Sequence, residues 1–265
     1  MIIDLPDTQL YVEESGSGKP LLLIHGFPFN HEIWRPQIDI LSSSARVIAP
    51  DLRGHGGSPP SPGPYTMDLL ADDCAKILDI LGVQEPVIVC GLSMGGYVTF
   101  AFYRRHPSLV AGIILTSTRA KDDPPEVKAN RDKTAALAEE SGVQAVIANM
   151  LPIVMAPQTY PADPDLVNRV KHIMEQTSLE GMVSALKGMK VRPDSSPTLD
   201  SISVPSLIIH GADDQIIPLS EAETMHGSIQ HSQLETIQDS GHLPNLEQPE
   251  LFNQAVKVFL SSLKS

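Results

Sequence analysis

Residues 87–97 read VIVCGLSMGGY, and this stretch decides the fold of the chain. Four apolar residues run directly into Gly91-Leu92-Ser93-Met94-Gly95, and a helix-compatible segment follows. A G-x-S-x-G pattern between a strand and a helix is typical of a sharp turn that exposes its serine as a nucleophile. A side chain at Gly91 or Gly95 would collide with the neighbouring strand or helix. The stretch therefore predicts a buried strand, a tight turn at Ser93 and a helix that begins directly after it.

The segments on either side of this turn alternate between two patterns. Short, mostly continuous apolar runs are typical of strands buried on both faces. Helical patterns fall between most of these runs, and such alternation predicts a parallel, doubly wound α/β sheet. The expected strands cover residues 10–13, 21–24, 47–49, 87–90, 112–116, 206–210 and 233–237, and the expected core helices cover 67–81, 95–105 and 251–263.

The alternation stops between residues 121 and 200, where only helical patterns occur. We expect a core domain formed by residues 1–120 and 201–265, with residues 121–200 inserted as an all-helical cap. A cap at this place would cover the C-terminal edge of the strands, where open α/β sheets bind ligands. The segment holds Met150, Met155, Met174, Met182 and Met189, which would either form an adaptable pocket wall or simply pack the cap against the core. The expected cap helices cover residues 126–140, 143–155, 165–177 and 179–189.

A serine nucleophile needs a general base, and the base needs an acid that orients it. Behind a turn of this type, the chain order is nucleophile, acid, histidine. The loop after the strand at 206–210 offers Asp214 as the acid, with Asp213 as the alternative. The loop after the last strand offers His242 as the general base. The sequence thus predicts Ser93, Asp214 and His242 as a catalytic triad.

An oxyanion hole would complete this site. One N–H group is expected from Met94, the residue after the nucleophile, and the second from Phe27 in the loop after the strand at 21–24. His25 in the same loop could be a second catalytic base, but we interpret it as a structural hydrogen-bonding residue below the site. The Gly-rich stretch from Asp51 to Ser58 lacks the G-x-x-x-x-G-K-[ST] pattern of a phosphate-binding loop, so we expect a turn that positions its neighbours.

Composition excludes several classes of function. With 32 acidic and 19 basic residues, the chain has a formal net charge of −13, which argues against nucleic acid and anionic membranes as partners. The remaining histidines lack metal-ligand spacing, and no G-x-G-x-x-G follows a strand, so we expect neither a metal nor a nucleotide cofactor. The cysteines Cys74 and Cys90 cannot form a disulfide framework. Without a signal-peptide pattern or a membrane-spanning run at hand, the expected location is the cytoplasm.

Together these motifs resemble those of the α/β-hydrolase superfamily over nearly the whole chain. The resemblance is carried by residues 25–28, 51–58, 91–95, 211–218 and 241–242. Within the superfamily, the chain looks most like small carboxylesterases, 3-oxoadipate enol-lactonases and cofactor-free haloperoxidases. The Pro28 beside Phe27 matches a feature of some perhydrolysing members, which implies a side activity with peroxide. Members that are epoxide hydrolases or haloalkane dehalogenases use an Asp nucleophile, and Ser93 argues against both.

The expected function is that of a serine hydrolase acting on small-molecule esters or lactones of small, largely apolar acids. The alternative from another class is a ligand-sensing protein that keeps the triad but turns over very slowly. Arg35, Arg119 and Arg131 are three candidates for binding a substrate carboxylate, as an enol-lactonase would require, although each would serve equally well as a surface charge. The sequence does not give the substrate or the oligomeric state.

Overall fold

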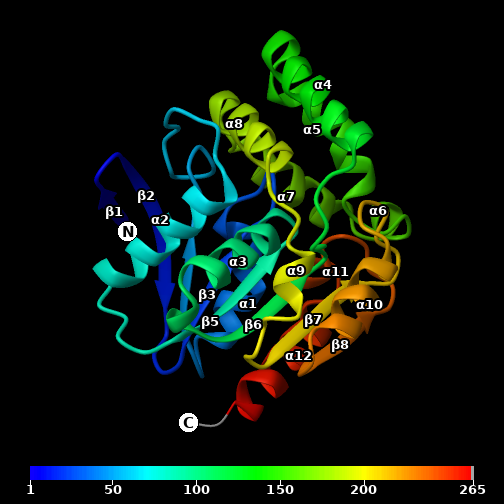
Figure 1. Cartoon of the computed structure of the whole chain (residues 1–265). Helices are drawn as coiled ribbons and strands as arrows, with labels where there is room; N and C mark the ends of the chain where they lie inside the picture. The colour runs from blue at the N-terminus through cyan, green and yellow to red at the C-terminus, as the bar shows by residue number, and fades with distance from the viewer. Residues whose placement is uncertain (264–265) are drawn as a thin grey trace.

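The computed structural model describes residues 1–263, and its centre is one eight-stranded sheet (Figure 1). The strand order is β1-β2-β4-β3-β5-β6-β7-β8. β1 and β2 pair antiparallel, as do β2 and β4, and all other neighbours are parallel. The predicted, mostly parallel α/β fold is therefore confirmed. The strands are β1 Ile2–Leu5, β2 Thr8–Ser15, β3 Pro20–Ile24, β4 Arg46–Pro50, β5 Val87–Leu92, β6 Val110–Thr116, β7 Ser206–Gly211 and β8 Ser232–Ile237.

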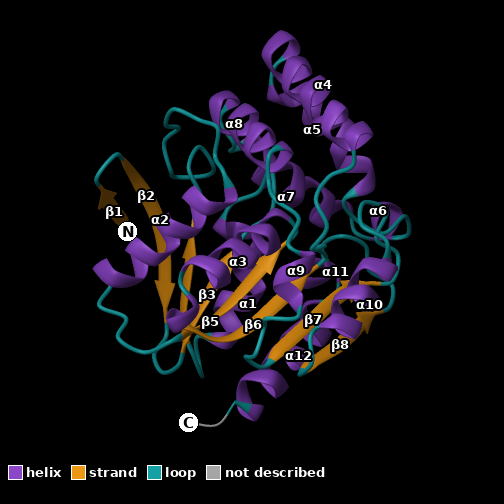
Figure 2. Ribbon diagram, in the orientation of Figure 1, coloured by secondary structure: helices purple, strands orange, loops and turns teal. Residues whose placement is uncertain are grey.

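The central strands are apolar at every position because helices cover both faces of the sheet (Figure 2). In β3, Leu22 and Ile24 face one apolar layer, whereas Leu21 and Leu23 face the other. Alternate residues of a strand point to opposite faces, so two buried faces require a continuous apolar run. The first layer includes α2 Met67–Ile80, α3 Met94–Arg105 and α10 Leu219–Ser228, and the second includes α1 Arg35–Leu41 and α12 Pro249–Ser262.

Between β6 and β7 the chain forms helices only. Figure 1 shows α4, α5 and α8 beyond the edge of the sheet to which the parallel strands point. This edge is where the loops after β3, β5, β7 and β8 also lie, since they leave the carboxyl ends of these strands. The inserted helices are α4 Pro125–Ser141, α5 Val143–Met150, α6 Thr159–Ala162, α7 Pro164–Glu175, α8 Leu179–Lys190 and α9 Ser196–Leu199.

Several elements were not predicted from the sequence. The strand β1 has only four residues, and its alternation of exposed and buried positions is too short to stand out. The helix expected at 143–155 ends at Met150 and continues as a 3₁₀ turn, Leu151–Ile153, because Pro152 has no N–H to donate within a helix. The sequence analysis also missed α1, α6, α9, α10, α11 Pro244–Glu247 and two further 3₁₀ turns, His31–Trp34 and Pro107–Leu109.

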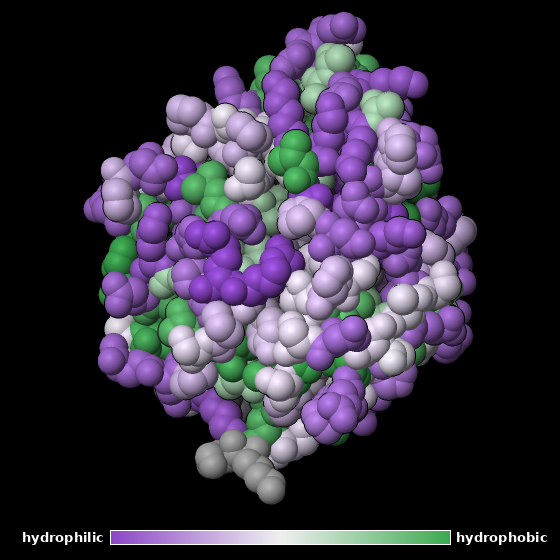
Figure 3. Space-filling model, in the orientation of Figure 1, coloured by the Kyte–Doolittle hydropathy of each residue, from purple (hydrophilic) through white to green (hydrophobic). Residues whose placement is uncertain are grey.

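The surface is hydrophilic over most of the face shown in Figure 3, with hydrophobic residues visible between α8 and α4. Large exposed apolar side chains are scattered, for example Ile80 on α2 and Val258 on α12. Within residues 1–263, no helix combines the length and the hydropathy needed to cross a bilayer.

Candidate active site

Ser93 stands between β5 and α3 with a backbone conformation that serine rarely adopts. Its φ is 54° and its ψ is −111°, in the region that favours glycine. Two hydrogen bonds from β6 and its following loop hold it there: the Ser93 N–H donates to the Thr116 carbonyl at 2.9 Å, and Thr118 Oγ1 donates to the Ser93 carbonyl at 2.8 Å. A strained residue fixed from both sides is typical of a functional position.

The two glycines of the motif are required by close packing, as the sequence predicted. A methyl group on Gly91 would overlap the Gly95 carbonyl, and one on Gly95 would overlap the Ile24 carbonyl at the end of β3. These contacts let α3 begin directly against the strand ends, which places Ser93 at the edge of the sheet.

His242 lies in the loop after β8, and its imidazole contacts Asp214 from the loop after β7. The distance from His242 Nδ1 to Asp214 Oδ2 is 2.8 Å. An ionised carboxylate only accepts hydrogen bonds, so Nδ1 carries the proton and donates it to Asp214. The other ring nitrogen, Nε2, is then the basic one. His242 also lines the same pocket as Ser93, although among residues 1–263 no hydrogen bond joins the two side chains. Such contacts are often long before substrate binds.

The surroundings of Asp214 keep its carboxylate ionised. Burial alone would raise the pKa of Asp214, but the charge and hydrogen bond of His242 outweigh it and lower the pKa below its ordinary value. The backbone N–H groups of Ile216 and Ile217 also donate to Asp214 Oδ1, at 2.8 and 3.0 Å. The alternative acid, Asp213, is exposed and accepts a hydrogen bond from Gln158 at 2.7 Å. Of the two candidates, it is Asp214 that contacts the histidine.

A second histidine, His210 at the end of β7, also lies against Asp214 and was missed in the sequence analysis. Its Nε2 is 3.5 Å from Asp214 Oδ2 and 2.9 Å from the Ile217 carbonyl. Burial lowers the pKa of His210. We interpret His210 as a neutral imidazole whose Nε2–H donates to the Ile217 carbonyl. It therefore packs against Asp214 and leaves the carboxylate to accept the Nδ1 proton of His242.

The loop after β3 lies directly against the Ser93 turn. A Cβ placed on Gly26 would be 3.2 Å from Ser93 Cβ and 3.1 Å from the Leu92 carbonyl oxygen. In the described part of the chain, neither the Phe27 N–H nor the Met94 N–H donates a hydrogen bond outside regular secondary structure. Met94 is also the first residue of α3, where backbone N–H groups have no partner within the helix. In the described part of the chain, the two predicted oxyanion-hole donors therefore have no partner outside regular secondary structure, and of the two residues Phe27 lines the pocket.

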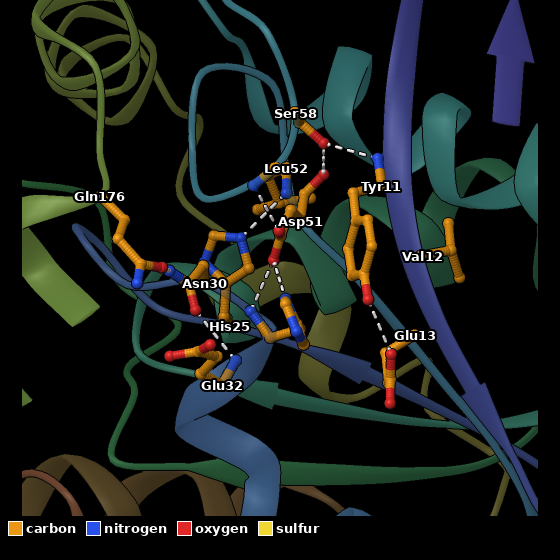
Figure 4. A network of polar contacts seen from close by, with 12 residues as sticks. Tyr11, Val12, Glu13, His25, Asn30, Glu32, Asp51, Leu52, Ser58 and Gln176 are labelled. Carbon is orange, nitrogen blue, oxygen red and sulfur yellow. Dashed lines mark hydrogen bonds and ion pairs between the residues drawn. The ribbon is translucent and has the colours of Figure 1, made fainter. Parts of the chain in front are cut away.

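The histidine of that loop, His25, is hydrogen-bonded to the backbone on both sides of its ring (Figure 4). Its Nε2 accepts from the Leu52 N–H at 2.9 Å, and its Nδ1 lies 2.9 Å from the Gly26 carbonyl. Burial lowers the pKa of His25 to about 3, so the ring is neutral near neutral pH. His25 therefore joins the oxyanion-hole loop to the turn after β4, in agreement with the interpretation as a structural residue.

That turn is built around the buried carboxylate of Asp51. One oxygen accepts from the His31 N–H at 2.6 Å and lies 2.8 Å from His31 Nδ1, while the other accepts from the Gly57 N–H at 2.8 Å. The Asp51 carbonyl accepts from Ser58 Oγ, which in turn accepts from the Tyr11 N–H (Figure 4). The stretch 51–58 thus positions its neighbours, as expected.

A pocket of about 260 Å³ is lined by the predicted nucleophile, the predicted base and the oxyanion-hole loop. Its floor contains Ser93, His242 and Phe27, and its walls are mostly apolar. Of the five methionines in the 121–200 segment, Met150 and Met189 line it. Met155, Met174 and Met182 are fully buried, so they contribute to packing instead.

One wall of the pocket carries a cluster of charged residues that the sequence showed only in part. Arg119 and Arg131 line the pocket, and both bind the buried carboxylate of Asp123. Arg192 binds the same carboxylate at 3.1 Å and stacks on the ring of Tyr97, 4.1 Å from its centroid. Arg192 gave no sequence signal because it lies 69 residues from Asp123 along the chain. Asp123 is only four and eight residues from Arg119 and Arg131, but no motif marks it.

The third arginine named from the sequence, Arg35, lies elsewhere. Its side chain is 44% exposed and pairs with Glu13 at 3.4 Å and Asp39 at 3.8 Å. It is not among the residues that line the pocket. The hypothesis that Arg35 binds a substrate carboxylate in the pocket is therefore wrong, and the structure shows Arg35 as a surface charge.

Glu247 at the end of α11 joins the histidine loop to the inserted segment. Its Oε1 accepts from the Gly241 N–H at 2.8 Å, and its Oε2 accepts from the Ala156 N–H at 2.7 Å and from Thr159 Oγ1 at 2.6 Å. Burial raises the pKa of Glu247 despite these hydrogen bonds. No motif marks this residue, because its partners come from two separate loops.

The two cysteines are buried, unreactive thiols. Cys74 on α2 and Cys90 on β5 are buried free thiols. Burial raises the pKa of both, that of Cys90 to about 12. Across residues 1–263, no group of three or more His, Cys, Asp or Glu side chains is arranged to hold a metal ion.

The fold and this site define the class of protein. A model of the alpha/beta hydrolase family matches residues 21–255, and the chain belongs to this family. It is 30% identical to 3-oxoadipate enol-lactonase 2 of Acinetobacter baylyi over 240 residues, which cover 91% of this chain and 88% of the relative.

Solved structures of related hydrolases have the same fold. A thermophilic esterase from Thermogutta terrifontis, determined with malate bound, is 37% identical with a TM-score of 0.97, and each chain is covered completely. The enol-lactonase from Burkholderia xenovorans LB400 is 27% identical with a TM-score of 0.92, covering 99% of this chain and 100% of that one. The chain is thus a hydrolase of the α/β family whose relatives include an esterase and enol-lactonases.

Proposed function

We propose that this chain is a serine hydrolase that cleaves carboxylic esters or lactones of small, largely apolar acids, without a cofactor. The observation that carries the proposal is the 2.8 Å contact between His242 Nδ1 and Asp214 Oδ2, in a pocket that also contains the strained Ser93. Related esterases and enol-lactonases support the same reaction class. The helical segment 121–200 acts in this proposal as a cap that shapes the acyl pocket.

In the first half of the reaction, His242 Nε2 removes the proton from Ser93 Oγ as this oxygen attacks the carbonyl carbon. The N–H groups of Phe27 and Met94 stabilise the negative charge that develops on the carbonyl oxygen. The carboxylate of Asp214 stabilises the imidazolium of His242. The imidazolium then protonates the leaving alcohol, and an acyl-Ser93 ester remains.

In the second half, His242 removes a proton from water, which attacks the acyl-Ser93 ester. The acid product leaves and the proton returns to Ser93 Oγ. For a lactone, the leaving alcohol stays attached to the acyl group, so one ring-opened product leaves after hydrolysis.

The test is hydrolysis of p-nitrophenyl esters from acetate to octanoate by wild type and by Ser93→Ala. We expect turnover by wild type and a loss of kcat of at least about 10⁴-fold in the variant, because the nucleophile is absent. The melting temperature should not fall, since alanine removes only a hydroxyl group. Full activity in pure Ser93→Ala would refute the proposal. Very slow turnover of every ester, with Ser93 still labelled by a fluorophosphonate, would favour a ligand-sensing protein instead.

A further inference from the structure

The pocket wall formed by Asp123, Arg119, Arg131 and Arg192, here called the arginine cluster, carries more positive than negative charge. Three guanidinium groups surround one carboxylate, which leaves a formal excess of two positive charges. The Asp123 side chain is completely buried. Burial alone would raise its pKa, but the hydrogen bond and charge of Arg131, with the charges of the other two arginines, lower it. Asp123 is therefore ionised, and the excess remains at neutral pH.

The hydrogen-bonding capacity of Asp123 is already used. Its Oδ1 accepts from Arg119 at 2.7 Å and contacts Arg192 at 3.1 Å, and its Oδ2 accepts from Arg131 Nε. A guanidinium has five N–H donors, so donors are left over. Within residues 1–263, Arg119 Nε is buried without a partner, and Arg131 makes its only other hydrogen bond to the weak acceptor Met189 Sδ, at 3.3 Å.

The charges of two neighbouring acids act on the cluster, that of Asp122 on Arg192 and that of Glu221 on Arg119, but neither acid forms an ion pair with it among residues 1–263. Asp122 pairs with Lys128 at 2.7 Å, and Asp132 pairs with Lys190 at 2.7 Å. The charge of Glu221 raises the pKa of Arg119, but less than Tyr97 and Asp123 do. The unmatched charge is thus a property of the cluster itself.

The two wall arginines are partly exposed and belong to the pocket lining. Arg119 and Arg131 are 17% and 15% exposed, and both line the cavity that contains Ser93 and His242. Arg192 is only 3% exposed and is held by Tyr97, so it supports the cluster from behind. In an otherwise mostly apolar cavity, an anion would bind more strongly to these guanidinium groups than in water.

We propose that Arg119 and Arg131 form a subsite for a carboxylate, so that the substrate is an ester or lactone whose acyl chain carries a second, charged carboxyl group. This inference rests on the proposed hydrolase function and narrows its substrate class: the apolar part of the acid lies over the pocket floor, and its charged end binds at the arginine wall. A neutral ester of equal length leaves the unused guanidinium donors without a partner.

The test compares two substrates that differ in charge and by one methyl group: 4-nitrophenyl hydrogen adipate and its methyl ester. The adipate chain is long enough to avoid rapid attack by its own carboxylate on the ester. For wild type, we expect kcat/KM to be at least about tenfold higher for the charged substrate, the range of a charge-assisted hydrogen bond. A wild-type preference for the methyl ester would overturn the proposal.

The variant is Arg119→Gln combined with Arg131→Gln, which leaves Asp123 paired with Arg192 and therefore avoids an unpaired buried carboxylate. It should lower kcat/KM for the charged ester at least about tenfold more than for the methyl ester. Arg131→Lys, which keeps the charge, should retain part of the preference. Arg35→Gln is the matched control and should retain all of it. An equal loss on both substrates would assign the cluster a purely structural role; single variants give the same comparison if the double variant does not fold.

A second readout separates this proposal from the hydrolase proposal. If wild type hydrolyses neither substrate, the ester hydrolase function fails, and binding of free adipate is then measured by titration calorimetry. Adipate binding that is lost in the double variant would support the subsite alone. No adipate binding to wild type would overturn the subsite as well.

Discussion

Two buried carboxylates, Asp214 and Asp123, hold side chains that line the pocket, and the chemical nature of their partners differs. Behind the floor, Asp214 contacts two histidines, His242 at 2.8 Å and His210 at 3.5 Å. On the wall, Asp123 has three permanent cations, Arg119, Arg131 and Arg192. A histidine can take up and release a proton near neutral pH, whereas an arginine stays charged. The floor is thus suited to proton transfer and the wall to holding fixed charge.

The two carboxylates also join different parts of the chain. Asp214 and His242 both lie in loops of the core, after β7 and β8. The arginine cluster takes Asp123 and Arg119 from the loop after β6, Arg131 from α4 and Arg192 from the residues after α8. The wall therefore connects the residues before α4 with the residues after α8, next to the ring of Tyr97 on α3.

Replacing the floor carboxylate should have the largest effect on rate. We expect Asp214→Asn to lower kcat by about 10⁴-fold, because an amide no longer fixes the tautomer of His242. The melting temperature should change little, since the amide oxygen can still accept from Ile216 and Ile217. Ester hydrolysis and thermal unfolding measure the two quantities. Asp213→Asn is the control, and a larger loss of kcat there than in Asp214→Asn would reverse the assignment of the acid.

Replacing the wall carboxylate should instead have the largest effect on stability. Asp123→Asn leaves three arginines without their counter-charge, and removing one partner of a buried pair costs about 3 kcal/mol of unfolding free energy. Denaturant unfolding of Asp123→Asn and of the surface control Asp122→Asn would measure this. The kcat for a neutral ester should fall far less than in Asp214→Asn. A stability loss no larger than that of Asp122→Asn would show that the cluster does not hold the inserted segment.

The same variant has a pH dependence with a defined sign. The pKa of Asp123 lies below its ordinary value of 3.8 in the folded protein, so its ionised form stabilises the fold at higher pH. This contribution is lost as the pH falls through the lowered pKa. The stability difference between wild type and Asp123→Asn should therefore be complete above about pH 5 and shrink below 3.8.

A smaller effect is expected at Glu247, which connects the loop of His242 to the segment between β6 and β7 through Gly241, Ala156 and Thr159. Glu247→Gln puts an amide N–H group where a hydrogen-bond donor already points, so the loop that carries His242 must shift. Because a displacement of about 1 Å can cost about 100-fold in rate, we expect a roughly tenfold lower kcat. KM for a neutral ester should change less, which distinguishes a positioning residue from a substrate contact. The control Glu250→Gln alters an exposed carboxylate on α12, and an equal effect there would contradict the role of Glu247.

Much of the floor could be predicted because its signals are local. The motif around Ser93 and the glycine at Gly26 follow apolar strands, and the short loop with His242 follows the last strand of the sheet. Parallel strands bring their following loops to one edge, so local motifs at strand ends are assembled by the fold itself. The catalytic roles of these residues stay predictions until the variants are measured.

The wall could not be predicted in the same way. Arg35, Arg119 and Arg131 looked alike in the sequence, yet Arg35 lies at the surface and the other two share Asp123. The partners of Glu247 are 6, 88 and 91 residues away along the chain. Arg192 is likewise 69 residues from Asp123. Such long-range pairings depend on how the inserted helices dock, which no local pattern specifies.

By itself, the sequence determined the α/β fold, the turn at Ser93 and the order of nucleophile, acid and histidine. These features follow from strand burial and from glycine packing, both of which are local properties of the chain. Only the tertiary structure decided which carboxylate contacts His242, which arginines line the pocket and how much positive charge remains unmatched there. The reason is physical: the charge state and free donors of a buried group depend on the partners that surround it in space.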